Sequence, residues 1–123
     1  MENCLFCKII NNEIPSYTIY EDELIKIFLD INPLSNGHCL VIPKKHFLDI
    51  NDVDSEYLNH IFTVVKELLP ILENKLNYDG ITLTQNNGIA QEIKHFHLHL
   101  IPKYKNKKKL SVEEVYNIIT KLN

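Results

Sequence analysis

Histidine and apolar residues alternate near the carboxyl end of the chain, in the run His95-Phe96-His97-Leu98-His99-Leu100-Ile101. Successive side chains of a β-strand point to opposite faces, so this alternation predicts a strand. His95, His97 and His99 then share one face, and the apolar residues between them share the other. We expect the apolar face to pack beneath a helix and the opposite face to present three imidazoles, each about 7 Å from the next.

The rest of the chain supplies partners for this strand. Apolar and β-branched runs predict strands over residues 17–21, 24–30, 38–42 and 81–84, besides the histidine-bearing strand over 93–101. Apolar residues at helical spacing predict helices over residues 5–12, from Asp54 or Ser55 to about Lys75, and over 111–122. Strands grouped around one long helix indicate an α+β fold, with a mainly antiparallel five-stranded sheet and short helices at both ends.

Two local signals refine the helices. Pro70 lies inside the long helix and should kink or divide it, because proline lacks the N–H that a helix needs. Ser111 and Glu114 have the spacing of a capping box, which opens the final helix.

Length and charge limit the classes of protein to consider. A chain of 123 residues is expected to form one domain over residues 1–123. The formal net charge of −3 gives no general attraction to nucleic acid, so no nucleic-acid partner is expected. All 13 basic residues are lysines, so a bound phosphate must be held by groups other than arginine forks.

The start of the chain, its apolar runs and its cysteine count predict the cellular compartment. The polar start of the chain lacks the pattern of a secretory signal, and no apolar run approaches the roughly 20 residues of a membrane span. Three cysteines fit a reducing compartment better than a disulfide framework. We therefore expect a cytoplasmic protein without a membrane partner.

Three interpretations of the histidine row remain open from the residues alone. The imidazoles could be solvated on an open sheet face, bind a metal ion together, or include a nucleophile that attacks phosphorus. A third histidine in line on one strand reaches a shared metal ion poorly. The row therefore favours a division into one ligand, one attacking group and one proton donor.

The histidine run and several other segments resemble the histidine triad (HIT) family, in particular its bacterial Hint-like branch. The likeness covers nearly the whole chain. The matching segments are Phe6-Cys7-Lys8-Ile9-Ile10, Glu13-Ile14-Pro15, Phe28-Leu29-Asp30-Ile31, Gly37-His38, Val41-Ile42-Pro43-Lys44-Lys45-His46, and Asn86-Asn87-Gly88 with Gln91.

This resemblance implies a hydrolase that cleaves nucleoside 5'-phosphoramidates or related nucleotidyl conjugates. The middle histidine, His97, would attack the α-phosphorus and form a nucleotidyl-histidine intermediate, and water would release the nucleoside monophosphate. His99 would contact the phosphate and assist proton transfer to the leaving group. A neighbouring backbone carbonyl should fix the tautomer of His97.

The family's nucleotide pocket maps onto five further residues. Asp30 would bind the ribose hydroxyls, with Phe28 and Ile31 near a purine base, while Asn86 and Gln91 would hold phosphate. From the residues alone, Asp30 could instead be a turn residue before Pro33, and the Asn86 segment a plain turn.

The loop before the triad departs from the family pattern. Only three steps separate Gly88 from Gln91 where the family usually has five, and Ala90 replaces a glycine. Glu92 stands where a serine is common, and a carboxylate there repels phosphate unless it points away. The preference for the leaving group is therefore open.

A structural zinc ion is the implied cofactor. Cys4-x-x-Cys7 is a weak signal alone, because two thiolates need two more ligands, and without them the pair could simply be buried. The resemblance supplies His46 and His95, giving a closed Cys₂His₂ site. Cys39 lies among apolar strand residues and is expected in the core.

The resemblance also implies a homodimer. The long helix and a strand would pair with those of the second copy, so that one continuous sheet runs through both. His38 is expected to bond to the backbone, His60 to lie at the surface or an interface, and the lysine-rich run 103–109 to be a solvated connection. Two other functions stay open: cleavage or phosphorolysis of dinucleoside polyphosphates, and nucleotide sensing with little turnover.

Overall fold

A single five-stranded sheet organises residues 3–121, which the computed structural model describes. Its strands lie in the order β1-β2-β3-β5-β4, and every neighbouring pair is antiparallel, which confirms the predicted fold class. The strands are β1 (Thr18–Glu21), β2 (Ile25–Leu29), β3 (Cys39–Pro43), β4 (Gly80–Gln85) and β5 (Leu98–Lys103). The helices are α1 (Leu5–Ile10), α2 (Ser55–Leu76), the 3-10 turn η1 (Gly88–Ala90) and α3 (Val112–Thr120).

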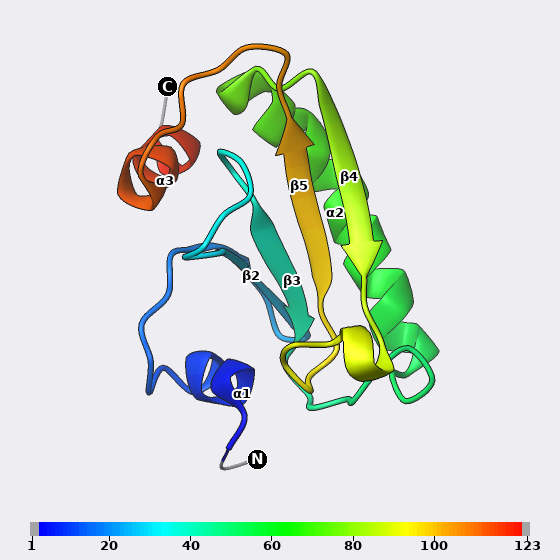
Figure 1. Cartoon of the computed structure of the whole chain (residues 1–123). Helices are drawn as coiled ribbons and strands as arrows, with labels where there is room; N and C mark the ends of the chain where they lie inside the picture. Colours follow the sequence, from blue (N-terminus) through cyan, green and yellow to red (C-terminus); the bar gives the residue numbers. More distant parts are fainter. Residues whose placement is uncertain (1–2, 122–123) are drawn as a thin grey trace.

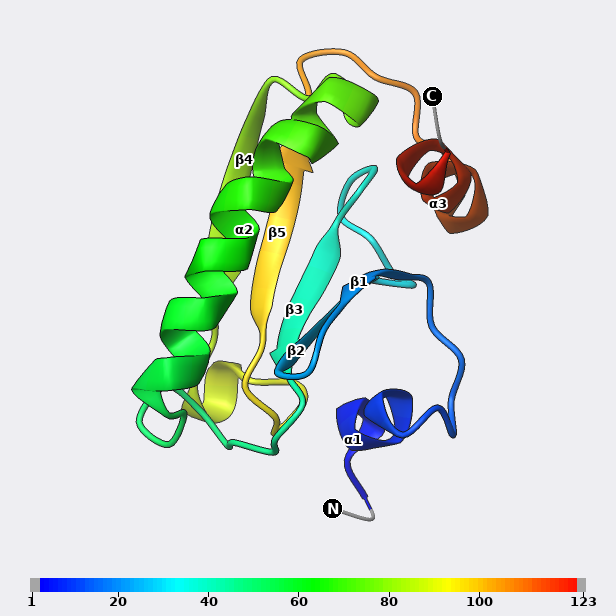
Figure 2. The same ribbon diagram turned by 180° about the vertical axis from the view of Figure 1, so that it is seen from behind.

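The long helix α2 covers one face of the sheet, as the views in Figures 1 and 2 show from opposite sides. Alternate residues of the central strands point to α2 and form the main core with it, among them Ile27, Val41, Leu98 and Leu100. The intervening residues, such as Phe28 and Leu40, form a second apolar cluster on the other face. The sheet therefore separates a packed core from the face that carries the histidines.

Helix α1 lies against this second face. The Phe6 ring meets the Phe28 ring edge to face, with the ring centroids 5.6 Å apart. Lys26 is 2% exposed, and its Nζ donates to the carbonyl of Ile9 at 3.0 Å, near the end of α1. A buried cation at a helix carboxyl end is favoured by the helix dipole. This short helix is thus fixed to the sheet by packing and by one charged hydrogen bond.

The histidine-bearing strand is shorter than the sequence predicts. β5 begins at Leu98 instead of residue 93, because pairing with β3 starts at the Val41–Leu98 register and residues 93–97 turn away from the ladder. The predicted alternation of faces nevertheless holds: Phe96 packs in the core with Leu98 and Leu100, and the histidines face the other way.

Pro70 does not divide α2, which is one helix over Ser55–Leu76. Pro70 and Lys66, four residues earlier, are both exposed. Water can therefore satisfy the Lys66 carbonyl that loses its N–H partner.

The helix ends differ in detail from the prediction. α1 ends at Ile10, and Asn12 takes a positive φ of 62°, which ends the helical path. Ser111 and Glu114 form the predicted capping box of α3, whereas the expected end at Leu122 lies outside the described residues. No helix within residues 3–121 has the length and apolar character needed to cross a membrane.

The turn between β2 and β3 is tied to the chain's last connection. The side chain of Asn36 donates to the carbonyl of Lys108 at 2.9 Å and accepts from the Leu110 N–H at 2.8 Å. Gly37 follows with φ at +91°, and a Cβ there would lie 2.5 Å from Leu76 Cδ1. Because Gly37 precedes His38, this crowded turn determines where His38 lies at the entry to β3.

We predict that Gly37→Ala lowers the free energy of unfolding by about 2–4 kcal/mol, through positive-φ strain and overlap with the buried Leu76 side chain. Urea denaturation measures the change. Gly80→Ala is the matched control, because a Cβ on Gly80 meets nothing within 4 Å. Equal effects of the two substitutions would contradict this account of the turn.

Candidate functional site

A cavity of about 600 Å³ opens on the sheet face away from α2. Helix α1 contributes Leu5, Phe6 and Ile9 to its wall, and the sheet contributes Phe28 and Leu40. The loop after β2, the loop after β4 and the histidine row complete it. The lining histidines are His38, His97 and His99.

His97 is held in one tautomer. Its Nδ1 lies 2.8 Å from the carbonyl oxygen of His95, and a carbonyl can only accept, so Nδ1 carries the proton and donates. Nε2 is then left with a free lone pair. The Phe6 ring packs against this imidazole nearly at right angles, with the centroids 5.0 Å apart, which limits rotation of the ring. The predicted carbonyl partner is therefore that of His95.

His99 is joined to His38, a contact that the sequence did not reveal. The Leu34 N–H donates to His38 Nδ1 at 3.0 Å, so His38 carries its proton on Nε2. That proton is donated to His99 Nδ1 at 3.0 Å, which leaves the proton of neutral His99 on Nε2. His99 thus retains one N–H for another partner.

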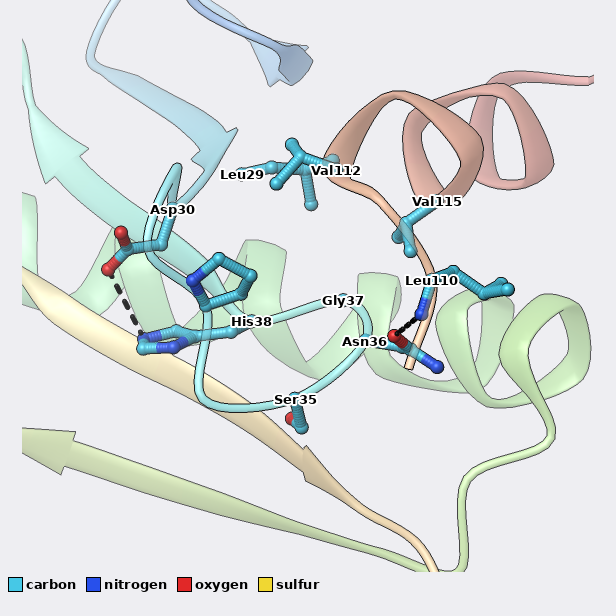
Figure 3. A pocket seen from close by; sticks show the side chains of 10 residues that line it. Leu29, Asp30, Ser35, Asn36, Gly37, His38, Leu110, Val112 and Val115 are labelled. Atoms are coloured by element: carbon cyan, nitrogen blue, oxygen red, sulfur yellow. Dashed lines mark hydrogen bonds and ion pairs between the residues drawn. The ribbon is translucent and has the colours of Figure 1, made fainter. Parts of the chain in front are cut away.

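Asp30 stands beside this histidine pair. Its Oδ2 lies 3.7 Å from His38 Nε2, and Figure 3 shows the two side chains turned toward each other, next to a small cavity behind the turn. Its other oxygen, Oδ1, accepts from the Asn32 N–H at 2.9 Å. The carboxylate is therefore oriented by its own loop and keeps acceptor capacity on Oδ2.

The histidine row is neutral at pH 7. Burial lowers the pKa of His97, and it lowers the pKa of His99 to about 4, with the nearby His97 and His38 adding to the effect. Burial likewise lowers the pKa of His38, against the opposing charge of Asp30. Neutral imidazole is the nucleophilic form, so the site is suited to attack by a ring nitrogen.

The predicted nucleotide-binding residues separate into two groups. Phe28, Asp30, Ile31 and Asn86 line the cavity together with His97 and His99. Gln91 does not: it is buried, and its amide donates to the carbonyl of Leu48 at 2.7 Å. This bond turns the Gln91 side chain toward another loop, away from the cavity. Its expected contact with phosphate stays a prediction.

Sequence reasoning missed part of the wall. Leu5, Phe6 and Ile9 of α1 line the cavity, yet their helical spacing indicated only an amphipathic segment. The role of His38 depends on the register that places Leu40 opposite His99. No residue pattern in a single sequence gives that register. Glu92, which stands where the family commonly has a serine, does line the cavity.

A second cluster joins the start of the chain to the histidine row. The ligand atoms of Cys4, Cys7, His46 and His95 all lie within 4.8 Å of one another. His95 Nδ1 lies 3.3 Å from Cys4 Sγ and 3.1 Å from His46 Nδ1, and Cys7 Sγ lies 3.2 Å from His46 Nδ1. The four predicted ligands are thus brought together.

These residues fit a tetrahedral zinc ion. Zinc bonds of about 2.0–2.1 Å to nitrogen and about 2.3 Å to sulfur place ligand atoms roughly 3.3–3.8 Å apart. The distances above are close to this. His95 Nε2 lies 2.9 Å from the carbonyl of Pro43, so it donates its proton there and leaves Nδ1 free to coordinate.

The remaining singled-out residues lie elsewhere. Cys39 is fully buried in the core, as expected. His60 is half-buried on α2, and its Nε2 lies 2.6 Å from Asp22 Oδ2. In the lysine-rich run, Lys107 donates to the carbonyl of Leu76, and every lysine is exposed, which agrees with a solvated connection.

Comparison with known proteins identifies the family. A model described as the HIT domain matches residues 11–106. An uncharacterised HIT-like protein of Methanocaldococcus jannaschii is 46% identical over 103 residues, covering 82% of this chain and 79% of that protein. The adenosine 5'-monophosphoramidase of Saccharomyces cerevisiae is 42% identical over 111 residues, covering 89% of this chain and 68% of that protein.

A solved structure agrees with these matches. The crystal structure of a zinc-bound histidine triad family protein from Mycobacterium smegmatis has a TM-score of 0.87 to this fold at 32% identity, covering 96% of this chain and 91% of that one. The chain therefore belongs to the histidine triad (HIT) family, as its alternating histidines indicated.

Proposed function

We propose that this protein hydrolyses nucleoside 5'-phosphoramidates or related nucleotidyl conjugates through a covalent intermediate on His97. The observation that carries the proposal is the free lone pair on Nε2 of a neutral, immobilised imidazole that lines a cavity of about 600 Å³. The yeast relative named as a monophosphoramidase supports a nucleotide hydrolase as the general class.

The nucleoside occupies the end of the cavity near Asp30. The Asp30 carboxylate accepts hydrogen bonds from the two ribose hydroxyls, which suits an oxygen with unused acceptor capacity. Phe28 and the exposed Ile31 provide apolar contact for a purine base. Asn86, across the cavity, donates its amide to phosphate.

The reaction then proceeds in two steps. His97 Nε2 forms a bond to the α-phosphorus, and the bond from phosphorus to the leaving nitrogen breaks. The electron pair goes to that nitrogen, which also takes a proton through the N–H of His99, and solvent restores this proton. Water next attacks phosphorus and loses one proton to solvent, the electron pair of the phosphorus–His97 bond returns to Nε2, and the monophosphate leaves with the water oxygen.

His38 is a positioning residue in this scheme. Its Nε2–H is donated to His99 Nδ1, so the proton of His99 stays on Nε2, where the leaving group can receive it. Asp30 favours the proton on His38 by its negative charge, 3.7 Å away.

We predict that His97→Ala lowers the release of adenosine monophosphate from a fluorogenic adenosine phosphoramidate by about 10³-fold or more, because the nucleophile is lost. Mass spectrometry of the rapidly quenched wild-type protein should show the added nucleotidyl group. His60→Ala, which removes a histidine outside the cavity, serves as the control.

Equal turnover by the two variants would refute the role of His97. Preferential cleavage of diadenosine tetraphosphate by the wild type would instead favour a dinucleoside polyphosphate hydrolase. Nucleotide binding without turnover of either compound would favour a sensor.

We also propose that Cys4, Cys7, His46 and His95 hold a structural zinc ion. The distances between the four ligand atoms and the orientation of His95 support a closed site. Burial raises the pKa of the Cys7 thiol, and a bound dication favours the thiolate in its place. A zinc ion there supplies a cross-link between the amino-terminal segment and the catalytic histidines.

Elemental analysis of the purified protein is expected to give about one zinc ion per chain. Cys7→Ser should lose most of the zinc and lower the melting temperature, because metal-binding energy contributes to folding. Cys39→Ala changes a cysteine of the core and should keep the zinc. Full zinc content in Cys7→Ser would contradict the ligand set.

We further propose a homodimer formed by α2 and β4. β4 is an edge strand, and the exposed apolar side chains Phe62 and Ile71 on α2 and Leu83 on β4 support an interface there. Light scattering should give about twice the 14.4 kDa of one chain.

Phe62→Lys should shift this mass toward the monomer, because it places a charge in the interface. Ile118→Lys on α3 should leave the mass unchanged. A monomeric wild-type protein at tens of micromolar would rule out a stable dimer of this kind.

A further inference from the structure

The charges that line the cavity are unusual for a site that receives an anionic substrate. Asp30 and Glu92 are its two charged residues apart from the histidines, and among residues 3–121 no lysine lines it. Burial lowers the pKa of His38 and of His99, so neither of these two lining histidines supplies a positive charge at pH 7. A nucleotide therefore brings its negative phosphate into a cavity that already carries two carboxylates.

The two carboxylates lie at opposite ends of the histidine row. Asp30 follows β2, at the end of the sheet toward which β5 runs. Glu92 lies at the opposite end, in the segment that leads from β4 into the start of β5. Figure 1 shows these two connections at opposite ends of the sheet.

This separation assigns different parts of the substrate to the two ends. Under the proposed function, on which this inference rests, Asp30 binds the ribose and the phosphorus lies over His97. The leaving group then extends toward Glu92, Asn86 and Ile93. A carboxylate attracts a positive charge at that end and repels a phosphate or sulfate leaving group.

We propose that Glu92 is a specificity-determining residue that selects nucleoside phosphoramidates with a cationic leaving amine. The substrate class is an adenosine phosphoramidate whose amine carries a second, positively charged ammonium group. Cleavage follows the two steps given above, with the scissile nitrogen leaving as the amine and the second ammonium group unchanged. Anionic leaving groups, including those of dinucleoside polyphosphates, are disfavoured by the same carboxylate.

Three adenosine phosphoramidates of similar length test the proposal: those of 1,3-diaminopropane, of propylamine and of β-alanine, which carry a terminal ammonium, a methyl group and a carboxylate. For the wild type, kcat/KM should fall in that order, with about a tenfold ratio between the first and the last. The ratio should shrink at high ionic strength, because Glu92 is exposed and its charge is screened.

The variants separate the carboxylate from the rest of the site. Glu92→Gln keeps the shape and removes the charge, and should reduce the ratio about fivefold, while Glu92→Asp retains the order of the substrates. Glu113→Gln on α3 changes the net charge equally and should keep the wild-type ratio. An unchanged ratio in Glu92→Gln, or equal turnover of the three substrates by the wild type, overturns the role of Glu92.

A different result identifies failure of the underlying function. If the wild type releases no adenosine monophosphate from any of the three compounds, the proposed hydrolase activity fails, and the role of Glu92 fails with it.

Discussion

The hydrogen bond from His97 Nδ1 to the carbonyl of His95 is the contact on which the site depends. It determines the tautomer of His97 and therefore which ring nitrogen can react. The same residue, His95, uses its ring to join the cluster of Cys4, Cys7 and His46 and to bond the Pro43 carbonyl. Backbone and side chain of one residue thus orient the His97 imidazole and anchor the segment that presents it.

The sheet makes this arrangement possible by keeping its two faces chemically distinct. On one face, Val41, Leu98 and Leu100 pack against α2 and keep the strands rigid. The other face is only partly covered, because α1 is short and leaves the histidines beside a cavity. The buried Lys26, bonded to the end of α1, holds that helix where Phe6 can pack against His97. A polar bond on the weakly covered face therefore supports the geometry of the site.

Much of this could be predicted from the sequence, because a side-chain period of two is a local property. The faces of His95, His97 and His99, the capping box at Ser111 and the α+β class all follow from local patterns. The start of β5 could not be predicted, since it depends on where β3 offers a partner, and the link between His38 and His99 depends on the same register. The bond of Gln91 to Leu48 joins two loops whose approach no pattern encodes. Family resemblance supplied His46 and His95 as partners of the cysteines, which spacing alone did not.

The cluster at the start of the chain joins residues that are far apart in synthesis as well as in sequence. Cys4 Sγ lies 3.3 Å from His95 Nδ1, and 91 positions separate the two residues. A ribosome that adds about 5–20 residues per second needs on the order of 5–20 seconds to add His95 after Cys4. Through that interval the nascent chain carries both thiols without His95, the second of their two imidazole partners. A thiol that oxidises in this interval can no longer pair with His95, so the interval is the time for which both cysteines must stay reduced if the cluster is to form.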